Sequence, residues 1–117
     1  MIKRIKDMQS ELKENMRGGK GTIEIQSIFT PEEFKGNSRL IAKIKVNPGC
    51  SIGMHEHDDE EEIYYVIRGE ATLTDSTLDK EVILKPGDAS LTLGGQSHAI
   101  RNDGQEVLEF IAIILLY

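Results

Sequence analysis

Cysteine is nearly absent from this sequence, and so are long hydrophobic segments. Cys50 is the only cysteine among 117 residues, which excludes an intrachain disulfide and fits a reducing compartment, so we expect a cytoplasmic protein. The longest apolar run, residues 110–117, is far shorter than the roughly 20 residues of a membrane-spanning helix. Residues 1–6 are basic but precede no apolar segment, which argues against a secretory signal.

Positive charge is also scarce. The chain has 14 Lys and Arg against 20 Asp and Glu, for a net charge of -6. Because the basic residues form no stripe, we expect neither nucleic acid nor a membrane surface as a partner. A hydrophobic content of 38% with 29% charged residues is ordinary for a globular protein, and the length suits one domain.

Short β-favouring runs dominate the chain from residue 39 onward, and turn residues rich in Gly and Pro separate them. Because the runs follow one another closely with little helix between them, they predict an antiparallel sandwich or barrel. The predicted strands are residues 40–46, 50–57, 63–67, 71–74, 81–84, 89–93, 98–101 and 107–116.

The N-terminal third is less regular. Residues 22–29 alternate between polar and apolar and predict a strand, and residues 30–33 predict a single helical turn. Apolar residues recur at three- and four-residue steps in residues 1–15, which indicates either a short helix or an arm that pairs with another element. We expect residues 1–38 to form an arm and first strand that pack on a barrel of residues 39–117, within one domain.

Only three histidines occur, and all three belong to one candidate site. His55 and His57 are two residues apart on a predicted strand, so their side chains project from the same face. Glu62 begins the next strand and His98 lies on a later one, so three imidazoles and one carboxylate can converge. This donor set suits Mn, Fe, Co, Ni, Cu or Zn better than Ca or Mg. The sequence therefore predicts a site for one divalent transition metal.

The carboxylate of this site has rivals. Glu60 and Glu61 lie in the same acidic stretch as Glu62, and spacing in a turn varies by one residue. We prefer Glu62, and we expect residues 58–61 to form a solvated turn whose negative potential favours cations.

Candidate pocket residues follow from strand alternation. Tyr64 shares a face with Glu62, and we take Tyr64 and Gln96 as the candidates for a catalytic or pocket-lining role. Met54 and Ile100 are further candidates for the lining, although Tyr64 fits the barrel core equally well and Ile100 is expected to fill the barrel. Arg101 is expected at the surface.

Two clusters of residues resemble the two motifs of the cupin family. The first motif is matched by Gly49, His55, His57, Glu62 and Gly69, and the second by Gly87, Gly95, His98 and Asn102. Leu93 departs from the pattern, which usually has proline at that position. Residues 70–86 form a short spacer between the motifs, similar to that of compact microbial single-domain cupins.

This resemblance implies an all-β fold, a double-stranded β-helix or jelly-roll barrel, whose metal ligands fall on His55, His57, Glu62 and His98. Four ligands leave two positions of an octahedral ion open for substrate or dioxygen. The family includes metal-dependent lyases and oxidoreductases, and we expect a decarboxylase or dioxygenase acting on a small carboxylate or carbonyl compound. The alternative is a non-catalytic module that binds a small ligand. The chain is similar to cupins grouped with oxalate decarboxylases, but it has Ile52 where those enzymes carry an arginine.

Residues 107–117 are apolar on both faces of the predicted strand, so both faces need cover. We expect a homodimer in which this strand or the N-terminal arm packs on the partner. In that arrangement Arg17 and Lys20 could reach a barrel mouth and bind a small anionic ligand; the alternative is an ordinary solvated glycine loop.

Overall fold

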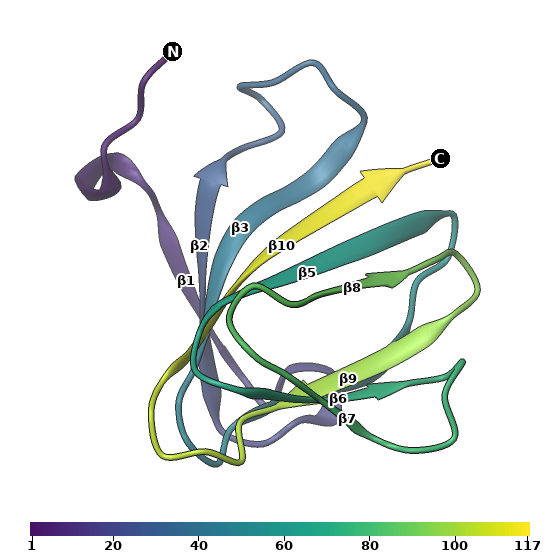
Figure 1. The fold of residues 1–117 in the computed structure, drawn as a ribbon. Coiled ribbons are helices and arrows are strands. Elements are labelled where there is room, and N and C mark those ends of the chain that lie inside the picture. The colour runs from purple at the N-terminus through teal and green to yellow at the C-terminus, as the bar shows by residue number, and fades with distance from the viewer.

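Two antiparallel β-sheets face each other and form an open barrel (Figure 1). The computed structural model describes all of residues 1–117. The larger sheet consists, in spatial order, of β1 (Ser10–Glu14), β2 (Thr22–Phe29), β3 (Ser38–Val46), β10 (Leu108–Leu116), β5 (Glu60–Arg68) and β8 (Ala89–Thr92). The smaller sheet consists of β4 (Ser51–Glu56), β9 (Ser97–Arg101), β6 (Ala71–Asp75) and β7 (Val82–Leu84).

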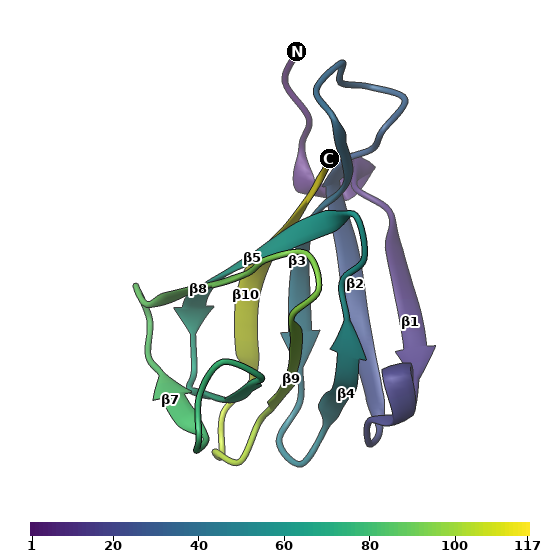
Figure 2. The same cartoon turned by 90° about the vertical axis from the view of Figure 1, so that its right-hand side faces the viewer.

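From β3 onward, the chain crosses between the two sheets at every connection except that from β6 to β7. The chain passes from β3 to β4, from β4 to β5 and from β5 to β6, and it crosses again through β8, β9 and β10. This winding is that of a jelly roll, and it confirms the predicted all-β class. Figure 2 shows β4 and β9 lying across the barrel from the strands of the larger sheet. No helix of the structure is long and apolar enough to cross a membrane.

The central strand β10 explains the long apolar run near the C-terminus. It lies between β3 and β5 and pairs with both along its length. Phe110, Ala112 and Ile114 point into the barrel and are at most 3% exposed; Phe110 and Ala112 join a core cluster between the sheets, and Ile114 lines a cavity. The alternate residues, including Ile111 and Ile113, lie on the outer face and are only half-buried.

The N-terminal segment is a strand rather than a helix. Strand β1 pairs antiparallel with β2 at the edge of the larger sheet, and the only helical element before it is the single turn η1 (Ile5–Asp7). The helical interpretation of residues 1–15 is therefore wrong, and the alternative, a pairing arm, is correct. The physical reason is that a short isolated helix is marginal in water, whereas the edge of the sheet offers ready backbone partners.

Candidate metal centre

The four residues expected to converge do lie together between the two sheets. His55 is on β4 and His57 directly follows that strand, while His98 is on β9 and Glu62 on β5. His55 and His98 are opposite each other in the β4–β9 register, and Glu62 enters from the other sheet. One donor atom from each of the four residues lies within 4.8 Å of all the others.

The donor spacing fits a single ion. The Nε2 atom of His98 lies 3.1 Å from Nε2 of both His55 and His57. Oε1 of Glu62 lies 2.9 Å from Nε2 of His57, 3.0 Å from Nε2 of His98 and 4.0 Å from Nε2 of His55. Two ligand atoms about 2.1 Å from one ion and at right angles to each other are about 3 Å apart. Glu62 Oε1 is buried and accepts no well-aligned hydrogen bond, so this oxygen is available to a bound ion.

The outer nitrogen of each imidazole is already engaged. His55 Nδ1 lies 2.8 Å from the Gly53 carbonyl oxygen, and His57 Nδ1 lies 2.6 Å from Oε2 of Glu60. Since both partners only accept hydrogen bonds, these contacts assign the proton to Nδ1 and leave the Nε2 lone pair directed at the shared centre. Such outer partners orient metal-binding imidazoles and raise their basicity.

The third imidazole is held by a hydroxyl group and by an aromatic ring. His98 Nδ1 lies 2.8 Å from Thr92 Oγ1, and Thr92 is opposite Glu62 in the β5–β8 register. The ring of Tyr64 stacks on His98 with centroids 4.7 Å apart. Burial raises the pKa of Tyr64 well above its ordinary value, so its hydroxyl group keeps its proton. The structure therefore places Tyr64, a candidate for a catalytic or pocket-lining role, against the His98 imidazole of the cluster.

Glu60 differs from the solvated turn expected for residues 58–61. It is 8% exposed, and Arg39 donates two hydrogen bonds to its carboxylate at 2.6 and 2.7 Å. The Arg39 guanidinium, together with His57 and against the effect of burial, lowers the pKa of Glu60 to about 2. The expectation fails here because β5 begins at Glu60, which gives this carboxylate two partners inside the fold. Glu60 therefore supports His57 from outside the cluster.

Glu62 is ionised inside the barrel. Burial raises the pKa of its carboxyl group, but interactions with the three imidazoles, in the state in which their Nε2 atoms carry protons, outweigh burial and lower this pKa below the ordinary range. Its rival Glu61 projects from the opposite face of β5 and is half-buried. The preference for Glu62 over Glu60 and Glu61 agrees with this geometry.

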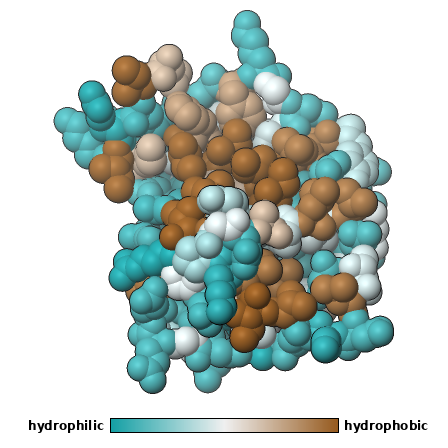
Figure 3. All heavy atoms as spheres, in the orientation of Figure 1, coloured by the Kyte–Doolittle hydropathy of each residue, from teal (hydrophilic) through white to brown (hydrophobic).

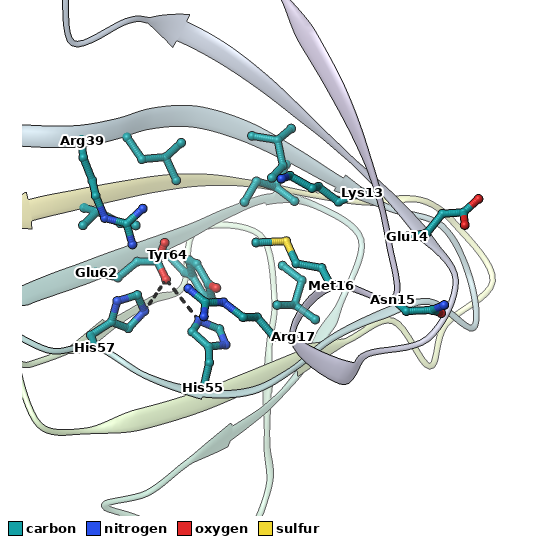
Figure 4. A pocket seen from close by; sticks show the side chains of 15 residues that line it. Lys13, Glu14, Asn15, Met16, Arg17, Arg39, His55, His57, Glu62 and Tyr64 are labelled. Carbon is teal, nitrogen blue, oxygen red and sulfur yellow. Dashed lines mark ion pairs between the residues drawn. The ribbon is translucent and has the colours of Figure 1, made fainter.

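A cavity of about 490 Å³ opens beside the imidazoles (Figure 4). Its lining includes His55, His57, Glu62 and Tyr64. Figure 4 also shows Arg17 and Arg39 extending toward these residues from two different elements. The open side of the cluster is therefore accessible to a small molecule.

Gln96 does not line this cavity. Its side-chain oxygen accepts a hydrogen bond from the backbone N–H of Leu93 at 2.9 Å, which closes the turn before β9. Met54 is 51% exposed on the outside of β4, and Ile100 is buried in the core. Arg101 lies at the surface with Glu81 and Asp103.

Sequence reasoning missed three residues around the cluster: Arg39, Thr92 and Gly53. Strand alternation could have placed Thr92 on the inward face. Arg39 carried no usable signal, because its partner Glu60 lies 21 positions away and meets it only across the folded sheet. Gly53 acts through its backbone carbonyl group, which any residue type also has.

Comparison with known proteins agrees with the fold and the cluster. The cupin domain family matches residues 42–114. An oxalate-binding protein of Thermotoga maritima is 41% identical over 116 residues, which cover 99% of this chain and 94% of the relative. The crystal structure of a predicted oxalate decarboxylase from the same organism matches with a TM-score of 0.93, 41% identity and 100% coverage of both chains.

A more distant structure shares the fold alone. A polyketide cyclase of Streptomyces resistomycificus is 19% identical, with a TM-score of 0.80, over 99% of this chain and 80% of its own. The family match, in contrast, spans more than half of the chain and includes all four residues of the cluster. The chain belongs to the cupin family.

Proposed function

We propose that this protein holds one divalent transition metal through His55, His57, Glu62 and His98 and binds a small carboxylate or carbonyl compound at that metal. The observation that carries the proposal is the convergence of three imidazole nitrogens and one unpartnered carboxylate oxygen, with neighbouring donor atoms 2.9–4.0 Å apart. The engaged Nδ1 atoms of His55 and His57 support it, because they leave the Nε2 lone pairs for an ion.

The donor set narrows the choice of metal. Imidazole with carboxylate suits Mn, Fe, Co, Ni, Cu and Zn. With four protein ligands, an ion of six-fold coordination keeps two positions for a ligand from the cavity. A metal in such an open site supplies Lewis-acid polarisation of a bound carboxylate or carbonyl group. The protein supplies the walls of the cavity and the orientation of the imidazoles.

The reaction proposed is of the decarboxylase or dioxygenase type, on a small anionic substrate. The similarity to an oxalate-binding protein supports a small carboxylate as the ligand. The alternative is a binding module without turnover. One observation favours it: Glu62 serves as a ligand of the proposed ion, and Glu60 is held by Arg39 and His57, so neither carboxylate is free for proton transfer.

The first test is metal content. His98→Ala removes one donor from the centre of the cluster, and we expect it to lose bound Mn(II), Co(II) or Zn(II) after dialysis against a weak chelator, whereas the wild type keeps one equivalent. Met54→Ala is the matched control, since Met54 is exposed on β4 beside His55. One equivalent of metal held with undiminished affinity by His98→Ala would refute the site.

The second test separates enzyme from binder. Metal-loaded wild type is incubated with small mono- and dicarboxylates and 2-oxo acids, while released carbon dioxide and consumed oxygen are measured. Turnover that His98→Ala abolishes supports the enzyme. Saturable binding with neither product formed nor oxygen consumed supports the binding module.

The outer face of the larger sheet supports a homodimer. Register aligns five apolar residues across five neighbouring strands, and we call them the apolar row: Phe29, Ile41, Ile113, Ile63 and Leu91. Figure 3 shows hydrophobic side chains gathered over β3, β10 and β5. Because a contiguous apolar surface of this kind marks an interaction site, we propose that a second copy of this chain covers it. The free and half-buried Cys50 fits our proposal of a cytoplasmic location.

A further inference from the structure

The short segment between β1 and β2 lies at the open side of the cavity. We call residues 15–19 the strap; it contains the turn η2 (Met16–Gly18). Asn15, Met16 and Arg17 of the strap line the same cavity as His55 and Glu62. Figure 4 shows the Arg17 side chain running from the strap toward His55 and Tyr64. The strap therefore brings a cation to the candidate metal centre from outside the two cupin motifs.

The backbone of the strap is fitted closely against β4. A Cβ atom on Gly53 would lie 2.1 Å from the Arg17 carbonyl oxygen, and one on Gly19 would lie 2.3 Å from the Ser51 carbonyl oxygen. Lys20, the residue directly after the strap, is also bound to Ser51. The Ser51 N–H donates to the Lys20 carbonyl oxygen and the Lys20 N–H donates to Ser51 Oγ, both at 2.8 Å. Since His55 follows Gly53 by two residues on the same strand, Arg17 is positioned relative to that imidazole.

Arg17 adopts a backbone conformation that arginine seldom takes. Its φ angle is 56°, and that of Asn15 is 48°. The left-handed region is costly for residues other than Gly, Asn and Asp. The contacts with β4 hold this conformation, in which the exposed Arg17 side chain lies at the cavity and extends toward His55 and Tyr64.

The charge of Arg17 is not neutralised within the chain. Three cations line the cavity: Lys13, Arg17 and Arg39. Arg39 is paired with Glu60, and Lys13 lies 2.8 Å from Glu11. Arg17 makes no ion pair and no side-chain hydrogen bond, and its positive charge acts on the Tyr64 hydroxyl group inside the barrel. A guanidinium group with free donors beside a metal centre is suited to bind a carboxylate in bidentate fashion.

We infer that Arg17 is the residue that selects dianionic ligands: one carboxylate of a short dicarboxylate occupies the metal, and the second is bound by the Arg17 guanidinium. This inference rests on the proposed function and specifies its substrate class. Strand β4 supplies no cation for the task, because Ile52, three residues before His55, is buried in the core. Lys20, the other candidate cation, does not line the cavity. A monocarboxylate would use the metal alone and gain nothing from Arg17.

The experiment compares a dianion with a monoanion on defined protein. Wild type, Arg17→Asn and Arg17→Lys are loaded with Co(II), and the binding of oxalate and of acetate is measured by calorimetry. Asn tolerates the left-handed backbone, so Arg17→Asn removes the guanidinium without adding strain. Arg68→Gln is the control, since Arg68 is exposed at the far end of β5. The visible spectrum of Co(II) reports whether the ligands of the metal are unchanged.

We expect Arg17→Asn to weaken oxalate binding by about 10- to 150-fold, the range of hydrogen bonds to a charged group. Acetate binding and the Co(II) spectrum should stay as in the wild type, so the preference for the dianion falls by the same factor. Arg17→Lys should recover part of the preference through its charge, and Arg68→Gln should match the wild type.

Two results would overturn the inference. If Arg17→Asn binds oxalate as tightly as the wild type with an unchanged spectrum, Arg17 is not the anchor, while the proposed metal site and its ligand binding stand. If the Co(II)-loaded wild type binds neither anion, the inference and the carboxylate part of the proposed function fail together. A protein that takes up no Co(II) refutes the metal site itself.

Discussion

Single residues outside the cluster define the chemistry of the residues inside it. His57 illustrates this. Its Nδ1 atom lies 2.6 Å from Oε2 of Glu60, and the same carboxylate accepts hydrogen bonds from Arg39. This chain of three side chains fixes the orientation of the imidazole and the position of its proton. A carboxylate behind a metal-binding histidine strengthens the metal bond.

Glu60→Gln should therefore weaken metal binding without removing a ligand. We expect a loss of about 10- to 100-fold in affinity, the usual effect of an outer partner of a metal-binding histidine, measured by competition with a chromophoric chelator. Glu61→Gln is the control, because Glu61 lies on the same strand but outside the cluster. Equal affinities in the two variants would show that Glu60 does not act through His57.

At the scale of elements, one contact between the strap and β4 ties the cavity wall to the metal centre. The contact depends on Gly53, where no space exists for a side chain. The same glycine offers its carbonyl oxygen to His55 Nδ1. A displacement at this position thus affects the strap and one imidazole together.

Gly53→Ala should push the strap away from β4. The added methyl group meets backbone atoms, which cannot rotate aside as a side chain does, so we expect a loss of about 1–3 kcal/mol in the free energy of unfolding. Urea denaturation measures this loss, and titration with oxalate should show the weakened binding of Arg17→Asn. The control is Gly36→Ala, where no atom lies within 4 Å of the new methyl group. This account would be contradicted if the Gly53→Ala protein unfolded at the same urea concentration as the control and bound oxalate with the same affinity.

At the scale of the whole molecule, the larger sheet has one face that is covered by the core and one face that no other element of the chain covers. Its inner face closes on the core, whereas its outer face presents the apolar row, with Leu91 49% exposed at the β8 end. Strand β8 is an edge of that sheet, so the row extends to the border of the molecule. A partner that covers it also protects this edge from nonspecific pairing.

Leu91→Glu should shift the protein from dimer toward monomer. We expect the dimer dissociation constant, measured by analytical ultracentrifugation, to rise at least about tenfold, since a buried unpaired charge is costly. Ile83→Glu is the control, because Ile83 is 58% exposed but lies on β7 of the other sheet. A wild-type protein that is monomeric at micromolar concentration would exclude the dimer.

The sequence alone determined the strand pattern and the residues of the cluster. Residues 22–29 were predicted as a strand and form β2 with the same bounds, because period-two alternation is a local property that one covered face imposes. The spacing of His55 and His57 and the supply of only three histidines were equally local signals. They predicted that the three histidines converge, and the spacing of the cupin motif favoured Glu62 as the carboxylate that joins them.

Only the tertiary structure decided which groups surround those four residues. The pairing of Arg39 with Glu60, the strand at residues 10–14 and the approach of Arg17 over Gly53 all join segments far apart in the sequence. Such contacts depend on register and on the winding of the chain between two sheets, neither of which leaves a local pattern. The four residues of the cluster could be predicted because they lie on the strands or, for His57, directly after one, whereas the position of Arg17 at the cavity depends on how a separate segment packs against β4.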